Sequence, residues 1–227
     1  MNINIPILML LGSCFICSIA TSQSNYRSGL LPSVNLNKEI AKDWQLNFKI
    51  ESRQLLKERS LGNITPYDYL HTDFAFVVSN KVGFNSKIGG GYLSRLKDNT
   101  FIHRLIQQYT YVEKYASFRL AHRFSTDQTF VKGAPTEYRF RYRATFEIPL
   151  NGKSIDPKEF YLKFNNEYLN AFEAREYDLE IRFSPLLGLK LNEGNKLELG
   201  LDYRLDSFLE NQTKNHFWTS INWYLKL

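Results

Sequence analysis

Residues 138–150 read Tyr-Arg-Phe-Arg-Tyr-Arg-Ala-Thr-Phe-Glu-Ile-Pro-Leu, and this stretch decides the fold class. Successive side chains of a β-strand point to opposite faces. A strand here would have an aromatic face, formed by Tyr138, Phe140, Tyr142 and Phe146, and a charged face, formed by Arg139, Arg141, Arg143 and Glu147. A helical period would scatter the aromatic residues around the axis, so the pattern predicts a strand.

Length and composition favour a single all-β domain. The chain has 227 residues, which suits one sandwich or barrel. Only 43% of the residues are hydrophobic, too few for a bundle of membrane-spanning helices, each of which needs about 20 mostly apolar residues. A membrane β-barrel needs an apolar residue only at alternate positions, and the 14 tyrosines and 17 phenylalanines suit its strands and interfacial girdles.

The first twenty residues differ from the rest of the chain. They contain no charged side chain, and their apolar run ends in Ser18-Ile19-Ala20, which predicts a secretory signal peptide over residues 1–20 with cleavage near 20–22. A lipoprotein reading of Leu11-Gly12-Ser13-Cys14 is the alternative. Both cysteines, Cys14 and Cys17, lie in this segment, so the mature chain would have no disulfide, thiolate metal site or cysteine nucleophile.

Alternating segments of about ten residues fill the remainder, residues 33–227. The polar connections between them alternate in length: short ones near residues 42, 81, 114, 152 and 194, longer ones over 56–66, 126–136 and 206–215, and briefer ones near 98 and 173. Outer-membrane barrels have short periplasmic turns and longer outer loops, and their tilted strands need about 9–11 residues to cross the membrane. The sequence therefore predicts an up-and-down antiparallel transmembrane β-barrel in a bacterial outer membrane.

The strand number is the difficult point. About eleven alternating segments can be counted. Single-chain bacterial barrels have an even number of strands, which puts both termini on the periplasmic side. We predict about twelve strands, within a range of 10–12, with residues 21–32 forming the first. The alternatives are that residues 21–32 thread the lumen or that the first alternating segment after them lies outside the wall.

The charged faces of the strands would line the lumen. Arginine is always charged and presents planar donors, so one interpretation is a pore that attracts anions. We favour the other interpretation, in which the charges pair across a narrow lumen and plug it, because buried charges require partners. The thirteen candidates are Arg104, Arg119, Arg123, Arg139, Arg141, Arg143, Glu147, Lys163, Glu167, Glu180, Arg182, Asp202 and Arg204.

The apolar faces would contact outer-membrane lipid. The predicted lipid-facing residues are Tyr138, Phe140, Tyr142, Phe146, Phe118, Leu120, Leu199 and Leu201. Outer-membrane lipid and the barrel-assembly machinery that inserts such proteins are therefore the expected partners. Nucleic acid is not, because arginines and aromatic residues on opposite faces cannot contact a phosphate and its base together.

Catalysis has little support in the sequence. The four histidines, His71, His103, His122 and His216, show no metal-ligand spacing, and we predict no enzyme activity, metal or other cofactor. Two alternatives remain open. One is an outer-membrane hydrolase acting on lipid, with His122 in a catalytic site between strands. The other is a secreted soluble β-sandwich that binds a ligand.

Several short motifs resemble those of the DUF2490 family of Bacteroidota envelope proteins. They are Lys42-Asp43-Trp44 followed by Glu51 and Arg53, His103-Arg104 with Gln107-Gln108, His122-Arg123-Phe124, residues 138–143 and Asn166-Glu167. The resemblance covers residues 30–227. The chain departs from the family at Ile102, where an acidic residue is common, and in ending at Leu227 instead of an aromatic residue. The resemblance implies an outer-membrane barrel of unassigned function and brings no catalytic residues with it.

Overall fold

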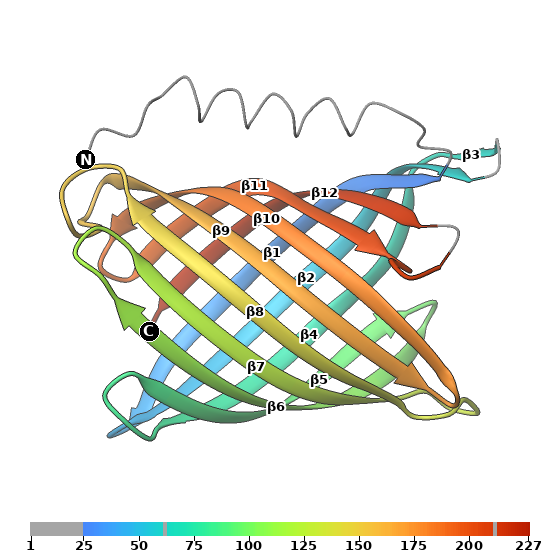
Figure 1. Ribbon diagram of the computed structural model, residues 1–227, viewed down its shortest axis with the longest axis horizontal. Helices are drawn as coiled ribbons and strands as arrows, with labels where there is room; N and C mark the ends of the chain where they lie inside the picture. Colours follow the sequence, from blue (N-terminus) through green and yellow to red (C-terminus); the bar gives the residue numbers. More distant parts are fainter. Residues whose placement is uncertain (1–24, 61–62, 211–212) are drawn as a thin grey trace.

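A computed structural model describes residues 25–60, 63–210 and 213–227, and the predicted signal peptide lies outside them. The described residues form twelve β-strands and no helix (Figure 1). The strands are β1 (Tyr26–Ala41), β2 (Trp44–Ser60), β3 (Asn63–Thr65), β4 (Asp68–Lys81), β5 (Ser86–Lys97), β6 (Thr100–Lys114), β7 (Arg119–Phe130), β8 (Glu137–Pro149), β9 (Glu159–Glu173), β10 (Glu176–Asn192), β11 (Asn195–Asp206) and β12 (Lys214–Lys226). This part of the chain has no helix long and apolar enough to cross a membrane.

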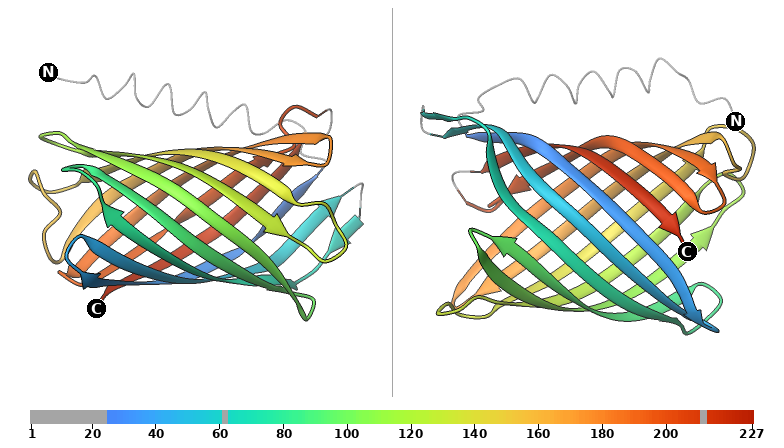
Figure 2. Two further views of the ribbon diagram at one scale, coloured as in Figure 1. Left: turned by 90° about the horizontal axis from the view of Figure 1, so that it is seen from below. Right: turned by 180° about the vertical axis from the view of Figure 1, so that it is seen from behind.

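The strands close into a barrel whose wall has eleven strands. Neighbouring strands are antiparallel from β2 through β4 to β12, and β1 completes the wall by pairing with β2 on one side and β12 on the other. The β1–β12 pairing is parallel and extends from Tyr26 opposite Asn215 to Asn37 opposite Lys226. Figure 2 (right) shows β1 in blue between β2 and the red β12. The three-residue β3 pairs with β2 and projects beyond the wall (Figure 1).

The all-β barrel and the number of twelve strands are confirmed, but the segment that supplies the twelfth strand differs from the prediction. Residues 26–41 are one continuous strand, and the twelfth strand is β3, outside the wall. Gly29 and Pro32 interrupt the apolar alternation of β1, which is why its first half is not recognisable in the sequence. Because β1 and β12 are parallel, β1 starts at one rim and β12 ends at the other. The expectation that both ends of the wall share one side is therefore wrong.

We call the rim where β1 begins the N rim and the rim where β12 ends the C rim. The predicted contrast between short and long connections holds only in part. The brief connections expected near residues 98 and 173 are the two-residue turns 98–99 and 174–175, which lie at the N rim beside its longer connections. The longest single connection without a strand of its own, residues 150–158, lies at the C rim, where a short turn at Gly152 was predicted. The wall strands are also longer than the predicted ten residues, at 12–17 residues each.

The two faces of the wall have opposite character. Large hydrophobic side chains are exposed on the outer surface, including Phe76, Tyr92, Phe140 and Leu199. Most of the buried side chains are polar or charged, and they lie inside the barrel. Buried hydrophobic residues form only small internal clusters, one of Leu31, Leu55 and Trp218 and one of Ala75, Leu93 and Ile106. The period-two alternation of the strands thus separates an apolar exterior from a polar interior.

The cation-rich lumen as the candidate functional site

The lumen contains a cavity of about 750 Å³. Its lining residues on β1 extend from Arg27, at the N rim, to Asn37, ten residues further along the strand. At about 3.3 Å per residue this is roughly 33 Å of strand, so the cavity follows most of the barrel's length. Thirteen cationic and six acidic side chains line it. The cavity is therefore elongated and has an excess of positive charge.

The structure places all thirteen predicted lumen residues on the inner face of the wall. Glu167 is buried beneath three arginines and has 1% of its side chain exposed. The other twelve line the cavity: Arg104, Arg119, Arg123, Arg139, Arg141, Arg143, Glu147, Lys163, Glu180, Arg182, Asp202 and Arg204. Their common orientation follows from the alternation of side chains within each strand.

Asp127 on β7 is the centre of one charge cluster. Its side chain is fully buried and forms ion pairs with Arg139 at 2.5 Å, Arg141 at 2.7 Å and Arg104 at 3.4 Å. Arg139 lies directly opposite Asp127 in the β7–β8 register, whereas Arg141 lies opposite Ser125 and reaches Asp127 diagonally. One carboxylate thus joins arginines from β6 and β8.

Glu167 on β9 is the centre of a second cluster. It lies opposite Arg143 on β8 and Arg182 on β10 in the register, and pairs with them at 2.7 and 2.9 Å. Arg123 on β7 reaches the same carboxylate at 3.3 Å. Arg182 also forms a two-fold contact with Glu180, with N–O distances of 2.7 and 2.9 Å. These pairs connect four adjacent strands.

Several other cations of the lumen pair with one carboxylate each. Arg95 donates both Nε and Nη2 to Asp73, at 2.7 and 2.8 Å. Similar single pairs are Lys49–Glu51, Lys163–Glu198 and Arg204–Asp202. Among the described residues, every ion pair joins strands no more than two places apart in the wall. The described ion pairs therefore run along the wall, whereas the prediction had the charges pairing across the lumen.

Two large aromatic side chains occupy interior space next to the cavity. Trp218 has 1% of its surface exposed and packs with Leu31 and Leu55, and the Arg53 guanidinium lies 5.1 Å from its ring centre. Tyr161 is fully buried and donates a hydrogen bond to Glu198 at 2.8 Å. These rings narrow the lumen beside the charged wall.

Several of these interior groups are absent from the predicted lumen residues. Residues 126–136 are expected to form a connection, but β7 continues to Phe130 and places Asp127 inside the barrel. The signal was present, since Ser125, Asp127 and Thr129 continue the inward alternation of Arg123. Asp73 and Arg95 follow the same rule in β4 and β5, as Glu51 and Arg53 do in β2, and none of the four is among the predicted lumen residues.

The predicted lipid-facing residues lie on the outer side of the wall. Tyr138 and Leu199 are 56% and 55% exposed. The others are exposed or half-buried against outer neighbours: Phe140, Phe146, Leu201, Tyr142, Leu120 and Phe118. Phe118 lies just before β7 instead of within a strand, and its ring stacks on Tyr115 with centroids 4.5 Å apart.

His122, the residue of the hydrolase alternative, lies on the outer face of β7. Its Nδ1 is 2.8 Å from the Tyr142 hydroxyl, and its Nε2 is 3.6 Å from a Glu113 carboxylate oxygen. No serine appears among its contacts in the described part of the chain. No group of three or more His, Cys, Asp or Glu residues there is arranged to hold a metal ion.

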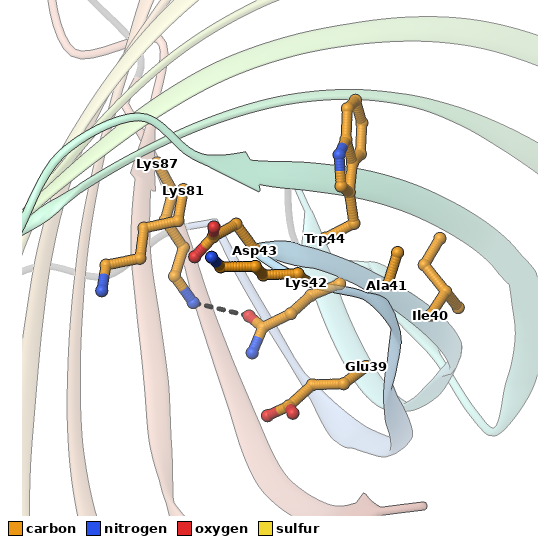
Figure 3. A pocket seen from close by; sticks show the side chains of 9 residues that line it. Glu39, Ile40, Ala41, Lys42, Asp43, Trp44, Lys81 and Lys87 are labelled. Carbon is orange, nitrogen blue, oxygen red and sulfur yellow. Dashed lines mark hydrogen bonds between the residues drawn. The ribbon is translucent and has the colours of Figure 1, made fainter.

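A second cavity, of about 500 Å³, lies at the C rim around the β1–β2 turn. Figure 3 shows Lys81 and Lys87 beside Asp43, with Glu39 on the other side of the turn and Trp44 pointing away from them. Lys87 donates a hydrogen bond to Gln45 at 2.5 Å. Its charges are mixed, so this cavity has no comparable excess of one sign.

Comparisons with known proteins give one match over most of the chain. A family model described as "Protein of unknown function (DUF2490)" matches residues 29–225. An ATP-dependent RNA helicase HrpA homolog of Haemophilus influenzae is 25% identical over 120 residues, which is 52% of this chain and 9% of the helicase. The chain thus spans less than a tenth of that protein. No solved structure matches it.

Proposed function

We propose, for a chain that belongs to the DUF2490 family of proteins of unknown function, a role as an outer-membrane β-barrel whose narrow lumen conducts small anions. In this proposal the protein is not an enzyme. Its outer face contacts lipid, and the barrel-assembly machinery inserts it after a signal peptide has directed its export. The proposal rests on the elongated, cation-rich cavity inside the barrel. The ion pairs around this cavity join strands no more than two places apart in the wall.

The outer surface supports the membrane location. Exposed aromatic and aliphatic side chains occur on β2 and on β4 to β12, which gives the barrel an apolar circumference. Contiguous apolar surface of this extent is unusual on a soluble monomer. The wall strands of 12–17 residues exceed the roughly 9–11 residues that a tilted strand needs to cross the hydrocarbon layer. A soluble sandwich would leave two sheets with edges, whereas this sheet is closed.

The lumen supports conduction of anions in preference to cations. Rings or rows of Arg and Lys are the usual lining of anion pores. Here the cationic side chains outnumber the acidic ones by thirteen to six along the cavity. A cavity of about 750 Å³ remains between the walls, so the paired charges do not fill the lumen.

The other activities lack comparable support. His122 contacts a tyrosine and a glutamate on the outer face, where a serine nucleophile would be needed for lipid hydrolysis. The helicase match covers a small part of that enzyme, and a phosphate loop leads into a helix, which the described residues do not contain.

Fractionation and bilayer recordings test this proposal. The protein should be recovered in the outer-membrane fraction and should migrate faster on a gel when unboiled than when boiled. In planar bilayers with a KCl gradient, its reversal potential should have the sign of chloride selectivity, and the selectivity should weaken as salt screens the lumen charges. Recovery as a soluble periplasmic protein would exclude the membrane location. A correctly folded barrel with no conductance would exclude the pore.

A further inference from the structure

Six arginines form one side of the lumen, and we call them the arginine wall: Arg104, Arg123, Arg139, Arg141, Arg143 and Arg182. They come from β6, β7, β8 and β10, and β9 between the last two supplies Glu167. We propose that the arginine wall is a binding site for a small oxyanion that carries two or more negative charges. This inference rests on the proposed function in one respect, because the solute must be able to enter the lumen.

The number of carboxylates is the first argument. Four of them pair with the arginine wall, namely Asp127 and Glu167 at its centre, Glu180 beside Arg182 and Glu137 at 3.6 Å from Arg139. Six cations thus face four anions. In the rest of the lumen the Arg95–Asp73, Lys163–Glu198 and Arg204–Asp202 pairs are one to one. The arginine wall thus has two positive charges more than its paired carboxylates, and a bound dianion would balance them.

The register of the strands is the second argument. Arg123 on β7 lies directly opposite Arg143 on β8, and both depend on Glu167 alone. Like charges at directly opposed positions of a sheet are destabilising. Arg141 has no acidic neighbour in register, since it lies between Ser125 and Leu169. This arrangement weakens the barrel unless another anion lies between the guanidinium groups.

Some N–H donors of the arginine wall have no acceptor among the described residues. A guanidinium has five N–H donors, and its planar fork fits phosphate and carboxylate oxygens two at a time. The Nε atoms of Arg123 and Arg141 are buried without an acceptor among the described residues. The wall therefore has more donors than its carboxylates satisfy. The adjoining cavity of about 750 Å³ has the size of a small-molecule site.

Titration calorimetry on the detergent-folded barrel tests the site without requiring conduction. Two probes separate the sources of such an anion: inorganic pyrophosphate represents phosphate compounds, and citrate represents carboxylates. We expect saturable binding of at least one of them, with chloride competing only at far higher concentration. The variants R141Q and R123Q should each lower the affinity about tenfold or more, because each removes charge-assisted hydrogen bonds.

The matched control removes a one-to-one ion pair away from the lumen cavity. The double variant E39Q/K226Q changes no net charge and should bind the same probe within about twofold of the unaltered protein. All variants are first shown to be folded by the difference in mobility between unboiled and boiled samples. Equal losses in the control and in R141Q, or the absence of binding for both probes, would overturn the proposed site.

Bilayer recordings separate this inference from the proposed pore. Binding in the calorimeter by a barrel that conducts nothing would leave the site standing and would exclude the pore. Chloride conductance that neither probe blocks, together with no binding, would leave the pore standing and would exclude the site. Conductance blocked by pyrophosphate or citrate, and relieved in R141Q, would support both.

Discussion

Asp127 and Glu167 each contact three guanidinium groups, and neither is accessible to bulk water. A buried carboxylate of this kind costs desolvation free energy, which only its cationic partners offset. Removing the carboxylate is more harmful than its pairwise contacts suggest, since it leaves several cations facing one another. The residues that limit the stability of the lumen are therefore the few carboxylates and not the many arginines.

We expect E167Q to lower the free energy of unfolding of the barrel by about 3 kcal/mol or more, because Arg123, Arg143 and Arg182 lose their shared anion. Urea titration of the barrel in lipid vesicles, read from the mobility of unboiled samples, measures the change in the free energy of unfolding. E193Q is the control, since Glu193 pairs with Lys190 but is 79% exposed, and its change should stay within about 0.5 kcal/mol. Equal stability of the two variants would contradict the proposed role of the shared carboxylate.

Among the elements, β1 has the special task of closing the barrel through one parallel and one antiparallel partner. Its close approach to β2 and β12 depends on Gly29, which lies at a register shift between β1 and β2. A Cβ at this position would be 2.1 Å from the Gln54 carbonyl oxygen and 2.6 Å from the Trp218 ring. The strand has no room to move away from both partners at once.

We therefore expect G29A to destabilise the closed barrel by about 1–3 kcal/mol or more, through overpacking at the seam. The measurement is the fraction of the protein that refolds into vesicles and shows the faster unboiled band. G90A is the matched control, because Gly90 also lies within a wall strand, β5, and a Cβ there would meet nothing within 4 Å. A normal refolding yield for G29A would mean that the seam is looser than the structure indicates.

For the whole molecule, the odd number of wall strands determines where the chain ends. The final residues lie at the C rim with the connection 150–158, and the connection 131–136 lies at the N rim. Single cysteines can test this, since the chain's own cysteines, Cys14 and Cys17, lie in the predicted signal peptide. In intact cells, a membrane-impermeant maleimide should label either K153C and L227C, or K132C. The rim that faces the outside of the cell determines which. Labelling of L227C together with K132C would show that the wall closes with an even number of strands.

The fold class and the face on which most side chains lie follow from the local sequence pattern. The alternation of Tyr138 and Arg139 along β8 depends only on the two-residue period of a strand, which is a local property of the backbone. The same rule accounts for the inward position of the thirteen predicted lumen residues. It would also have identified Asp127, if β7 had been followed to its end at Phe130.

The number of strands in the wall and the pairing of the charged residues depend on the tertiary structure. The parallel pairing of β1 with β12 joins segments about 190 residues apart, and local sequence patterns contain no information about that hydrogen bonding. The sharing of Glu167 among Arg123, Arg143 and Arg182 likewise depends on the register of four strands. Whether the charges cross the lumen or follow its wall is a consequence of barrel closure, which sets the distance between opposite walls.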